Sequence, residues 1–282
     1  MGRPNAGKST LFNAFLGQRL SIVTAKPQTT RNRILGILTR PQSQMIFLDT
    51  PGLLDPSYKL HEHMEASIDL ASREADVVIL LADATRIQDR DNLVRAFVKR
   101  NNTPLIAVLN KIDLVDPQQI EEAQKIWSAA FSLDPPLPIS ALTGTQIDVL
   151  VEQVEQLLPT GAQLYPDDMI AEQPERFFVS ELIREAAFSL LSDELPYALN
   201  VEIEEFVERQ PKTFIRAVLH VERESQKGIE IGKRGIRLRE IGAQARPAIE
   251  TFIQAPIYLE LWVKVRPDWR NKERALREFG YQ

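Results

Sequence analysis

Apolar residues in the first 158 positions form short runs that alternate with stretches of helical spacing. The runs predict strands at 34–38, 45–48, 77–82, 105–109 and 138–140. The stretches predict helices at 8–16, 61–71, 92–100, 118–131 and 147–158. This alternation predicts an α/β fold with a mainly parallel sheet flanked by helices.

The rest of the chain follows another order. Residues 159–175 are rich in proline and polar side chains and lack periodicity, which is typical of a linker. Beyond them the pattern predicts a helix at 176–191, strands near 199–207 and 213–222, a helix at 236–253, a strand at 257–265 and a helix after Pro267. We therefore predict a first domain over 1–160, a linker over 161–175 and a smaller α+β domain over 176–282.

Charge refines this picture because its distribution is uneven. The net charge of −5 argues against a nucleic-acid binder. Residues 193–208 carry six acids and no base, whereas 209–246 carry ten bases and four acids, which leaves room for a local RNA site. The chain has no cysteine, which excludes disulfides and thiolate-bound zinc and fits a reducing cytosol.

A phosphate-binding loop stands at the start of the chain. The pattern GxxxxGK[ST] is met by Gly2, Arg3, Pro4, Asn5, Ala6, Gly7, Lys8 and Ser9, with Thr10 next. The glycines let successive backbone N–H groups point at phosphate oxygens, and the helix that opens at Lys8 directs its positive end to the same anion. We expect Lys8 to reach the β- and γ-phosphates and Ser9 to bind Mg²⁺.

Three more motifs, each at a strand end, specify the nucleotide. Their residues are Asp49, Thr50, Pro51 and Gly52 (DxxG, followed by Leu53), Asn110, Lys111 and Asp113 (NKxD), and Ser140, Ala141 and Leu142. We expect Asp49 to hold Mg²⁺ through water and Gly52 to meet the γ-phosphate. Asp113 can accept two hydrogen bonds from guanine, whereas adenine would leave it unpaired. The motifs predict a GTP site at the carboxyl ends of the strands.

The segment between the first helix and the first strand reads as a nucleotide-sensitive switch. It comprises Gln28, Thr29, Thr30, Arg31 and Asn32. A threonine here would complete the Mg²⁺ shell only when the γ-phosphate is present, and we favour Thr30 over Thr29. A threonine-rich surface turn is the alternative.

Hydrolysis is expected to be slow. Leu53 occupies the position where Ras-like enzymes have a glutamine that orients the attacking water, and leucine cannot hydrogen-bond to water. We assign the catalytic roles to Asn5, Lys8, Thr30 and Gly52. Asn5 together with the Thr-Thr-Arg segment resembles GTPases activated by K⁺, but Asn5 could equally just support the turn.

The second domain contains a GxxG loop, formed by Gly232, Lys233, Arg234 and Gly235. It lies between the segment 226–231 and an amphipathic helix, after two strands and before a third, which is the order of a KH module. Glycines allow close approach of an RNA backbone, and cations contact its phosphates. We expect RNA contacts from this loop and from Lys227, Arg237 and Arg239; a solvated basic helix face is the alternative.

Taken together, these motifs resemble the Era family of bacterial GTPases. The resemblance rests on the TTRNR segment 29–33, the DTPGL segment 49–53, and the segments 194–197, 221–224, 230–233 and 259–265. It implies a type II KH domain that binds the 3′ region of small-subunit ribosomal RNA, a role in maturation of that subunit, and a monomeric cytoplasmic protein with some peripheral contact to the inner membrane.

Two other functions are compatible with the same residues. One is a non-catalytic, GTP-bound scaffold or chaperone for RNA, which Leu53 favours. The other is an ATPase with the same phosphate loop, against which Asn110 and Asp113 argue. His61, His63 and His220 are scattered, and we expect no catalytic role for them.

The start of the chain is unusual for this fold, because only Met1 precedes the phosphate loop where a strand of about 5–6 residues is the rule. Such a strand would lie centrally, between those that end at Asp49 and Asp83. We therefore expect the native polypeptide to begin roughly ten residues earlier, with a GTG valine codon read as the start.

Overall fold

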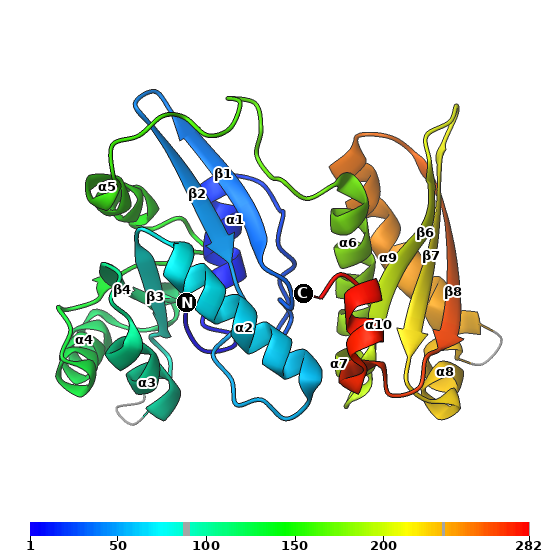
Figure 1. The fold of residues 1–282 in the computed structure, drawn as a ribbon, viewed down its shortest axis with the longest axis horizontal. Helices are drawn as coiled ribbons and strands as arrows, with labels where there is room; N and C mark the ends of the chain where they lie inside the picture. The colour runs from blue at the N-terminus through cyan, green and yellow to red at the C-terminus, as the bar shows by residue number, and fades with distance from the viewer. Residues whose placement is uncertain (87–90, 233–234, 282) are drawn as a thin grey trace. The chain divides into compact units, whose positions relative to one another are not determined.

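The computed structural model describes residues 1–86, 91–232 and 235–281. Two compact units are present (Figure 1). Unit 1 comprises Met1–Ser21, Thr30–Ser57 and His61–Glu172, and unit 2 comprises Ile22–Thr29, Tyr58–Leu60 and Gln173–Gln282.

The first part of the chain alternates helices and strands. In order, these are α1 (Lys8–Leu16), β1 (Ile34–Arg40), β2 (Ser43–Asp49), α2 (Lys59–Glu74), β3 (Val78–Asp83), α3 (Asn92–Arg100), β4 (Leu105–Asn110), η1 (Ile112–Leu114), α4 (Pro117–Phe131), β5 (Leu137–Pro138) and α5 (Ile147–Leu157). The helix ends follow local chemistry: Asp91 caps α3 by accepting from the N–H groups of Leu93 and Val94, and Asp116 forms a capping box with Gln119 at α4.

A parallel sheet in the order β3-β4-β5 carries the core of unit 1. One face packs against α1 and α5, where Leu81 and Val108 meet Leu150; the other packs against α3 and α4, where Leu80 meets Phe97. Because both faces are covered, β3 is apolar along its length instead of alternating. The predicted parallel α/β fold is confirmed.

The hairpin β1–β2 forms a separate antiparallel sheet. Met1 and Gly2 lie beside β3, where the Leu81 N–H donates to the Met1 carbonyl at 2.9 Å and Gly2 bridges to Leu81. The hydrophobic pattern located each strand to within a few residues, but pairing depends on contacts distant in sequence, so the division into two sheets was not predicted.

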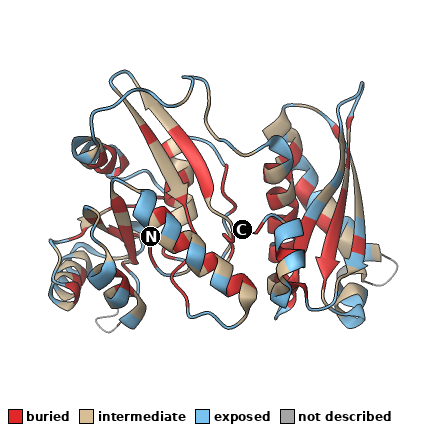
Figure 2. Cartoon of the chain, in the orientation of Figure 1, coloured by how far each residue is buried: buried red, intermediate tan, exposed pale blue. Residues whose placement is uncertain are grey.

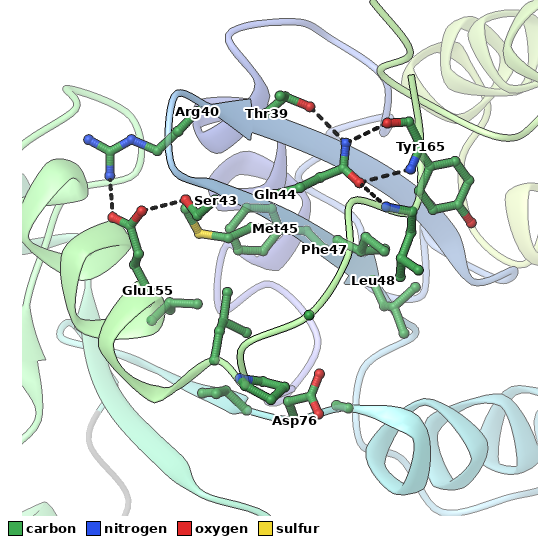
Figure 3. Close-up of a pocket in the computed structure, with 18 of the residues that line it drawn as sticks. Thr39, Arg40, Ser43, Gln44, Met45, Phe47, Leu48, Asp76, Glu155 and Tyr165 are labelled. Atoms are coloured by element: carbon green, nitrogen blue, oxygen red, sulfur yellow. Dashed lines mark hydrogen bonds and ion pairs between the residues drawn. The ribbon is translucent and has the colours of Figure 1, made fainter. Parts of the chain in front are cut away.

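A cavity of about 1530 Å³ lies within unit 1, lined by β2, the start of β3, the end of α5 and residues 159–167 (Figure 3). The side chain of Gln44 fixes its rim, donating to the Tyr165 carbonyl at 2.9 Å and accepting from the N–H groups of Leu164 and Tyr165. Further along, the Ile37 N–H donates to the Ile170 carbonyl. The first part of the predicted linker is therefore held against unit 1.

Unit 2 is built mainly from the rest of the chain. Its elements are α6 (Glu175–Leu190), α7 (Leu195–Ala198), β6 (Asn200–Val207), β7 (Thr213–Val221), α8 (Glu224–Ile231), α9 (Ile236–Ile253), β8 (Ile257–Val265), η3 (Trp269–Asn271) and α10 (Glu273–Glu278). The segment 226–231, which the sequence left unassigned, belongs to α8.

One face of the sheet β6-β7-β8 forms the core of unit 2. β6 and β7 are antiparallel, and β7 and β8 are parallel. Every second residue of β7, such as Ile215 and Leu219, packs against Ile183 of α6 and Ile241 of α9. Figure 2 shows the resulting rows of buried residues along α6 and β7. This face confirms the period-two pattern predicted for the strand at 257–265.

Candidate functional site

The phosphate loop adopts the backbone that its glycines allow. Gly2 has φ 141° and Gly7 has φ 96°, both positive, and Asn5 is also left-handed at φ 64°. A Cβ atom on Gly7 would lie 2.1 Å from Nδ2 of Asn110, so only glycine fits. The loop leads directly into α1, whose N-terminal N–H groups point back to the loop.

Lys8 stands at the first turn of α1 with its ammonium held over the loop. Its Nζ donates to the Arg3 carbonyl at 3.0 Å. The side chain is partly exposed, yet surrounding atoms crowd the ammonium, and this burial lowers the pKa of Lys8 to about 8, against the opposing attraction of Asp49. An anion at the loop would relieve this desolvation, so Lys8 is suited to phosphate.

Four polar side chains converge beside the loop. The Ser9 hydroxyl donates to Oδ2 of Asp49 at 2.7 Å and lies 2.9 Å from the Thr30 hydroxyl. Ser21 donates to the same carboxylate oxygen at 2.6 Å, and Thr30 lies 3.4 Å from it. These residues come from α1, the following loop, the switch segment and the end of β2, and meet only in the folded unit.

This cluster fits a magnesium ion. The second carboxylate oxygen of Asp49, Oδ1, is buried and has no hydrogen-bond partner among the described residues. Hydroxyl and carboxylate oxygens are the ligands that Mg²⁺ takes, usually with waters and phosphates in the other positions. No group of three or more His, Cys, Asp or Glu side chains suited to a metal occurs in the described part of the chain.

The two switch threonines differ in their surroundings. Thr30 belongs to unit 1 and joins the cluster with Ser9. Thr29 belongs to unit 2, and its hydroxyl donates to the Lys26 carbonyl at 2.9 Å and lies 2.8 Å from that of Thr24. The geometry therefore favours Thr30 as the candidate ligand. The neighbouring Gln28 is left-handed at φ 58°.

Gly52 and Leu53 have separate tasks. A Cβ on Gly52 would lie 2.7 Å from the backbone nitrogen of Pro4, so the DxxG glycine is needed for the close approach of two loops. The Leu53 side chain is buried beside Ile68 and Val78, and its N–H donates to the Gly2 carbonyl at 3.0 Å. Leu53 is thus a packing residue in this structure.

Asn110 connects three loops. It is 1% exposed, its Nδ2 donates to the Ala6 carbonyl at 2.9 Å, and its Oδ1 accepts from the Ala141 N–H at 2.9 Å. Each buried hydrogen bond left unmade costs about 1–3 kcal/mol. Asn110 therefore holds the phosphate loop against the loop that follows β5.

Asp113 lies at the surface beside the loop that follows β5. Its carboxylate is exposed, and Oδ1 accepts from the Ser140 hydroxyl at 2.5 Å. Ser140 also accepts from the Thr143 N–H at 3.2 Å, and Leu142 beside it is exposed. The predicted NKxD and 140–142 residues thus lie together.

Two residues of the site escaped sequence reasoning. Ser21 lies in an aperiodic loop and Asp83 at the end of β3, and neither belongs to a motif. Lys111, left-handed at φ 69°, donates to Oδ2 of Asp83 at 2.6 Å. Burial would raise the pKa of Asp83, but hydrogen bonds from Lys111 and Thr85 outweigh it and hold the pKa below its usual value. A carboxylate at the end of a parallel strand was the signal for Asp83.

The GxxG region of unit 2 is described on either side of its central pair. Lys233 and Arg234, two of the predicted RNA contacts, lie outside the described residues. Gly232 ends α8 with φ 69°, and Gly235 begins α9 with φ 74°. A Cβ on Gly232 would lie 3.0 Å from Cβ of Arg237 and 3.1 Å from its backbone nitrogen.

Apolar and basic side chains surround this turn. Ile229 and Ile236 are exposed on its two sides, and exposed isoleucines can contact unstacked bases. Arg237 forms an ion pair with Glu240 at 3.3 Å, while Lys227 and Arg239 lie on the same two helices. The described RNA candidates therefore share one turn between two helices.

The histidines lie apart from both sites. His61 is buried near the start of α2, where its Nδ1 accepts from the Ser57 N–H at 3.3 Å, and His220 lies in β7 next to Glu202. Their placement agrees with structural roles.

Family models match both parts of the chain. Residues 1–111 match the 50S ribosome-binding GTPase family, and residues 194–270 match the KH domain family. The glycine turns, Lys8 and Asn110 described above fall within the first match, and the second match covers the GxxG turn, so the chain is a GTP-binding GTPase joined to an RNA-binding KH domain.

Two solved structures resemble it over nearly its whole length. Both cover 99% of this chain and 96% of their own, at 40% sequence identity and a TM-score of 0.94. One is Era in complex with MgGDPNP and nucleotides 1506–1542 of 16S ribosomal RNA, and the other is a variant of Aquifex aeolicus Era bound to GDP·AlF4⁻. The chain belongs to the Era family. The predicted family, fold and GTPase activity are confirmed, and the ATPase and non-catalytic scaffold are set aside.

Proposed function

We propose that the chain is a GTP-dependent RNA-binding switch in maturation of the small ribosomal subunit. The observation that carries the nucleotide half is the convergence of Ser9, Thr30 and Asp49 beside the phosphate loop, with one carboxylate oxygen left without a partner. Under this proposal Mg²⁺ is held by Ser9 and Thr30 and, through water, by Asp49. When bound, the ion would neutralise charge that develops on the phosphates during transfer.

The GTP site would use the predicted residues of four loops. Gly2–Thr10 would surround the phosphates, Asp49–Leu53 would follow the γ-phosphate, and Asn110, Lys111 and Asp113 with Ser140–Leu142 would hold the base. Asp113 accepts from Ser140 at 2.5 Å and is exposed, which supports its role towards N1–H and the 2-amino group of guanine.

Catalysis would depend on charge and position and not on a residue that orients water. Lys8 would stabilise charge on the phosphates, Thr30 and Gly52 would sense the γ-phosphate, and Asn5 would help to hold a K⁺ ion. The burial of Leu53 supports a slow intrinsic rate, in the range of about 10⁻⁴ to 10⁻² s⁻¹ that unassisted GTPases show. Single-turnover rates of GTP hydrolysis in KCl and NaCl test both the slow intrinsic rate and the role of K⁺. Equal rates in the two salts would show that K⁺ has no role in hydrolysis.

RNA would bind at the turn between α8 and α9, through Lys227, Gly232–Gly235, Arg237 and Arg239. The likeness to Era in complex with nucleotides 1506–1542 of 16S ribosomal RNA supports the 3′ region of that RNA as the ligand. The switch residues Gln28–Asn32 would respond to GTP, and such coupling is typically worth about 1–3 kcal/mol.

The proposal includes the wider setting. The chain would work as a monomer with a G domain over 1–160, a linker over 161–175 and a KH domain over 176–282, in the cytoplasm and in peripheral contact with the inner membrane. None of the described helices is long and apolar enough to span a bilayer. Sedimentation and vesicle flotation test the monomer and the membrane contact.

A binding experiment tests the central claim. The intact chain is titrated with a 3′-terminal fragment of 16S ribosomal RNA, in the presence of GDPNP or GDP, and phosphate release from GTP is followed with and without the RNA. We expect different RNA affinities in the two nucleotide states. Equal affinities, together with equal affinity for a shuffled RNA, would show that the chain is neither a switch nor specific for this sequence.

A further inference from the structure

The sheet of unit 2 has a second face that carries no core residue contacts from α6 or α9. Alternation places Phe214, Arg216, Val218 and His220 of β7 on this outer face, in register with Tyr258, Glu260, Trp262 and Lys264 of β8. From β6, Glu202 and Glu205 share it, opposite Val218 and Arg216. Two aromatic side chains on this face, Tyr258 and Trp262, are 59% and 54% exposed.

Trp262 is the centre of this outer face. Its side chain is 54% exposed, and its indole N–H donates to Oε1 of Glu260 at 2.8 Å, which fixes the ring. Val218 lies between Trp262 and Glu202 in register and is fully buried although it is on the outer face. Trp262 and Glu202 are two strand spacings apart, roughly 10 Å.

The charges around Trp262 do not balance. Arg216 pairs with both Glu205 and Glu260, so one cation faces two carboxylates, and Lys264 pairs with Glu204. Glu202 hydrogen-bonds to His220 at 2.8 Å. Burial lowers the pKa of His220, although the hydrogen bond and charge of Glu202 oppose this, so the imidazole is neutral at pH 7 and leaves the Glu202 charge uncompensated. With Arg209 also counted, this face carries four carboxylates (Glu202, Glu204, Glu205 and Glu260) and three cations (Arg209, Arg216 and Lys264), so one negative charge remains.

The same face shows which cation would fit. At its other end, the guanidinium groups of Arg209 and Arg216 lie 4.9 and 5.4 Å from the ring centroid of Phe214, and Phe214 stacks on Tyr258. Within the described residues, no cation lies over Trp262. A planar guanidinium can stack on the indole and reach a neighbouring carboxylate, which an ammonium cannot do as well.

We propose that the outer face of the β6-β7-β8 sheet, centred on Trp262, binds an arginine-rich segment of a protein partner. Single-stranded RNA is the less suitable occupant, since its phosphates would meet a face on which carboxylates outnumber cations. The site is also separate from the turn between α8 and α9, so it extends the function beyond RNA and nucleotide.

Tryptophan fluorescence makes the test specific. The chain has three tryptophans, and Trp127 and Trp269 are 4% and 0% exposed, so Trp262 is the one that a surface ligand can reach. We expect a nona-arginine peptide to change the emission of the intact chain saturably, with a nona-lysine peptide binding several-fold more weakly. Trp262→Phe should abolish the signal while a labelled peptide still binds.

The peptide affinities of variants distinguish binding at a specific site from non-specific attraction by the net negative charge of the protein. By anisotropy of a labelled nona-arginine peptide, Trp262→Ala should weaken binding about tenfold and Glu202→Gln about threefold. Glu152→Gln removes the same charge from an exposed position on α5 and should leave the affinity unchanged. Thermal unfolding confirms that each variant is folded. Equal losses in Glu202→Gln and Glu152→Gln, or a Trp262 response to oligouridine and not to the peptide, would overturn the proposal.

Discussion

The nucleotide site of unit 1 and the GxxG turn of unit 2 are both proposed to bind phosphates, but they are built differently. The first is a network in which Asp49 and Asn110 are buried and each bonds to groups far away in sequence. The second lies between α8 and α9, and basic side chains such as Lys227 and Arg239 stand on these two helices. Single substitutions in the network should therefore cause large losses of nucleotide affinity. Single substitutions at the turn should cause smaller losses of RNA affinity that depend on salt concentration.

The sharpest way to break this comparison is Lys8→Ala. Removing a partly desolvated ammonium that is proposed to contact phosphate should weaken GDP binding about 100-fold, which corresponds to about 3 kcal/mol. Titration with a fluorescent GDP measures this. Lys125→Ala, at an exposed position of α4, is the control and should bind GDP with normal affinity. The Lys8→Ala variant itself should keep its normal affinity for RNA.

Gly232→Asp is the converse change. A side chain at φ 69° is strained and would crowd the Arg237 backbone, and the new carboxylate would repel RNA. We expect RNA affinity to fall roughly thirtyfold, about 2 kcal/mol, with GTP affinity unchanged. Gly161→Asp adds the same charge where a Cβ meets no atom within 4 Å, and normal RNA binding there would show that the loss is local.

The Lys8 pKa provides a pH test of the first site alone. Phosphate binding favours the ammonium and so raises a free-state pKa of about 8. Affinity for GDP should therefore be level below pH 8 and fall above it, roughly tenfold between pH 7 and pH 9. Calorimetry at pH 8.5 in two buffers of different ionisation enthalpy should detect proton uptake on binding. Absence of uptake would contradict the burial of this ammonium.

The smallest expected effect distinguishes the two switch threonines. Thr30→Ala should weaken binding of Mg²⁺ with GDPNP about fivefold and leave GDP unaffected, because the hydroxyl meets Ser9 and Asp49. Thr29→Ala should change neither nucleotide, since that hydroxyl bonds within the 24–29 turn. The reverse pattern would make Thr29 the ligand.

Sequence alone located most of the site, because its motifs are local and stand at strand ends. The helix at 8–16 and the strand at 257–265 were predicted with their observed bounds. What escaped depends on distance along the chain. Ser21 reaches Asp49 across 28 positions and Asn110 reaches Ala6 across 104, and no periodicity encodes such pairs. From its motif, Asn110 was predicted only to bind the base, so its buried hydrogen bonds to two other loops were not predicted.

Those bonds have an evolutionary consequence. Because one amide bonds to both the phosphate loop and the loop that follows β5, any effect of these loops on phosphate affinity and on base specificity should be coupled through Asn110. A substitution of Asn110 is expected to change phosphate affinity and base specificity together. Selection or engineering for a new base would therefore have to begin at the exposed Asp113, where base specificity can change while phosphate affinity is kept.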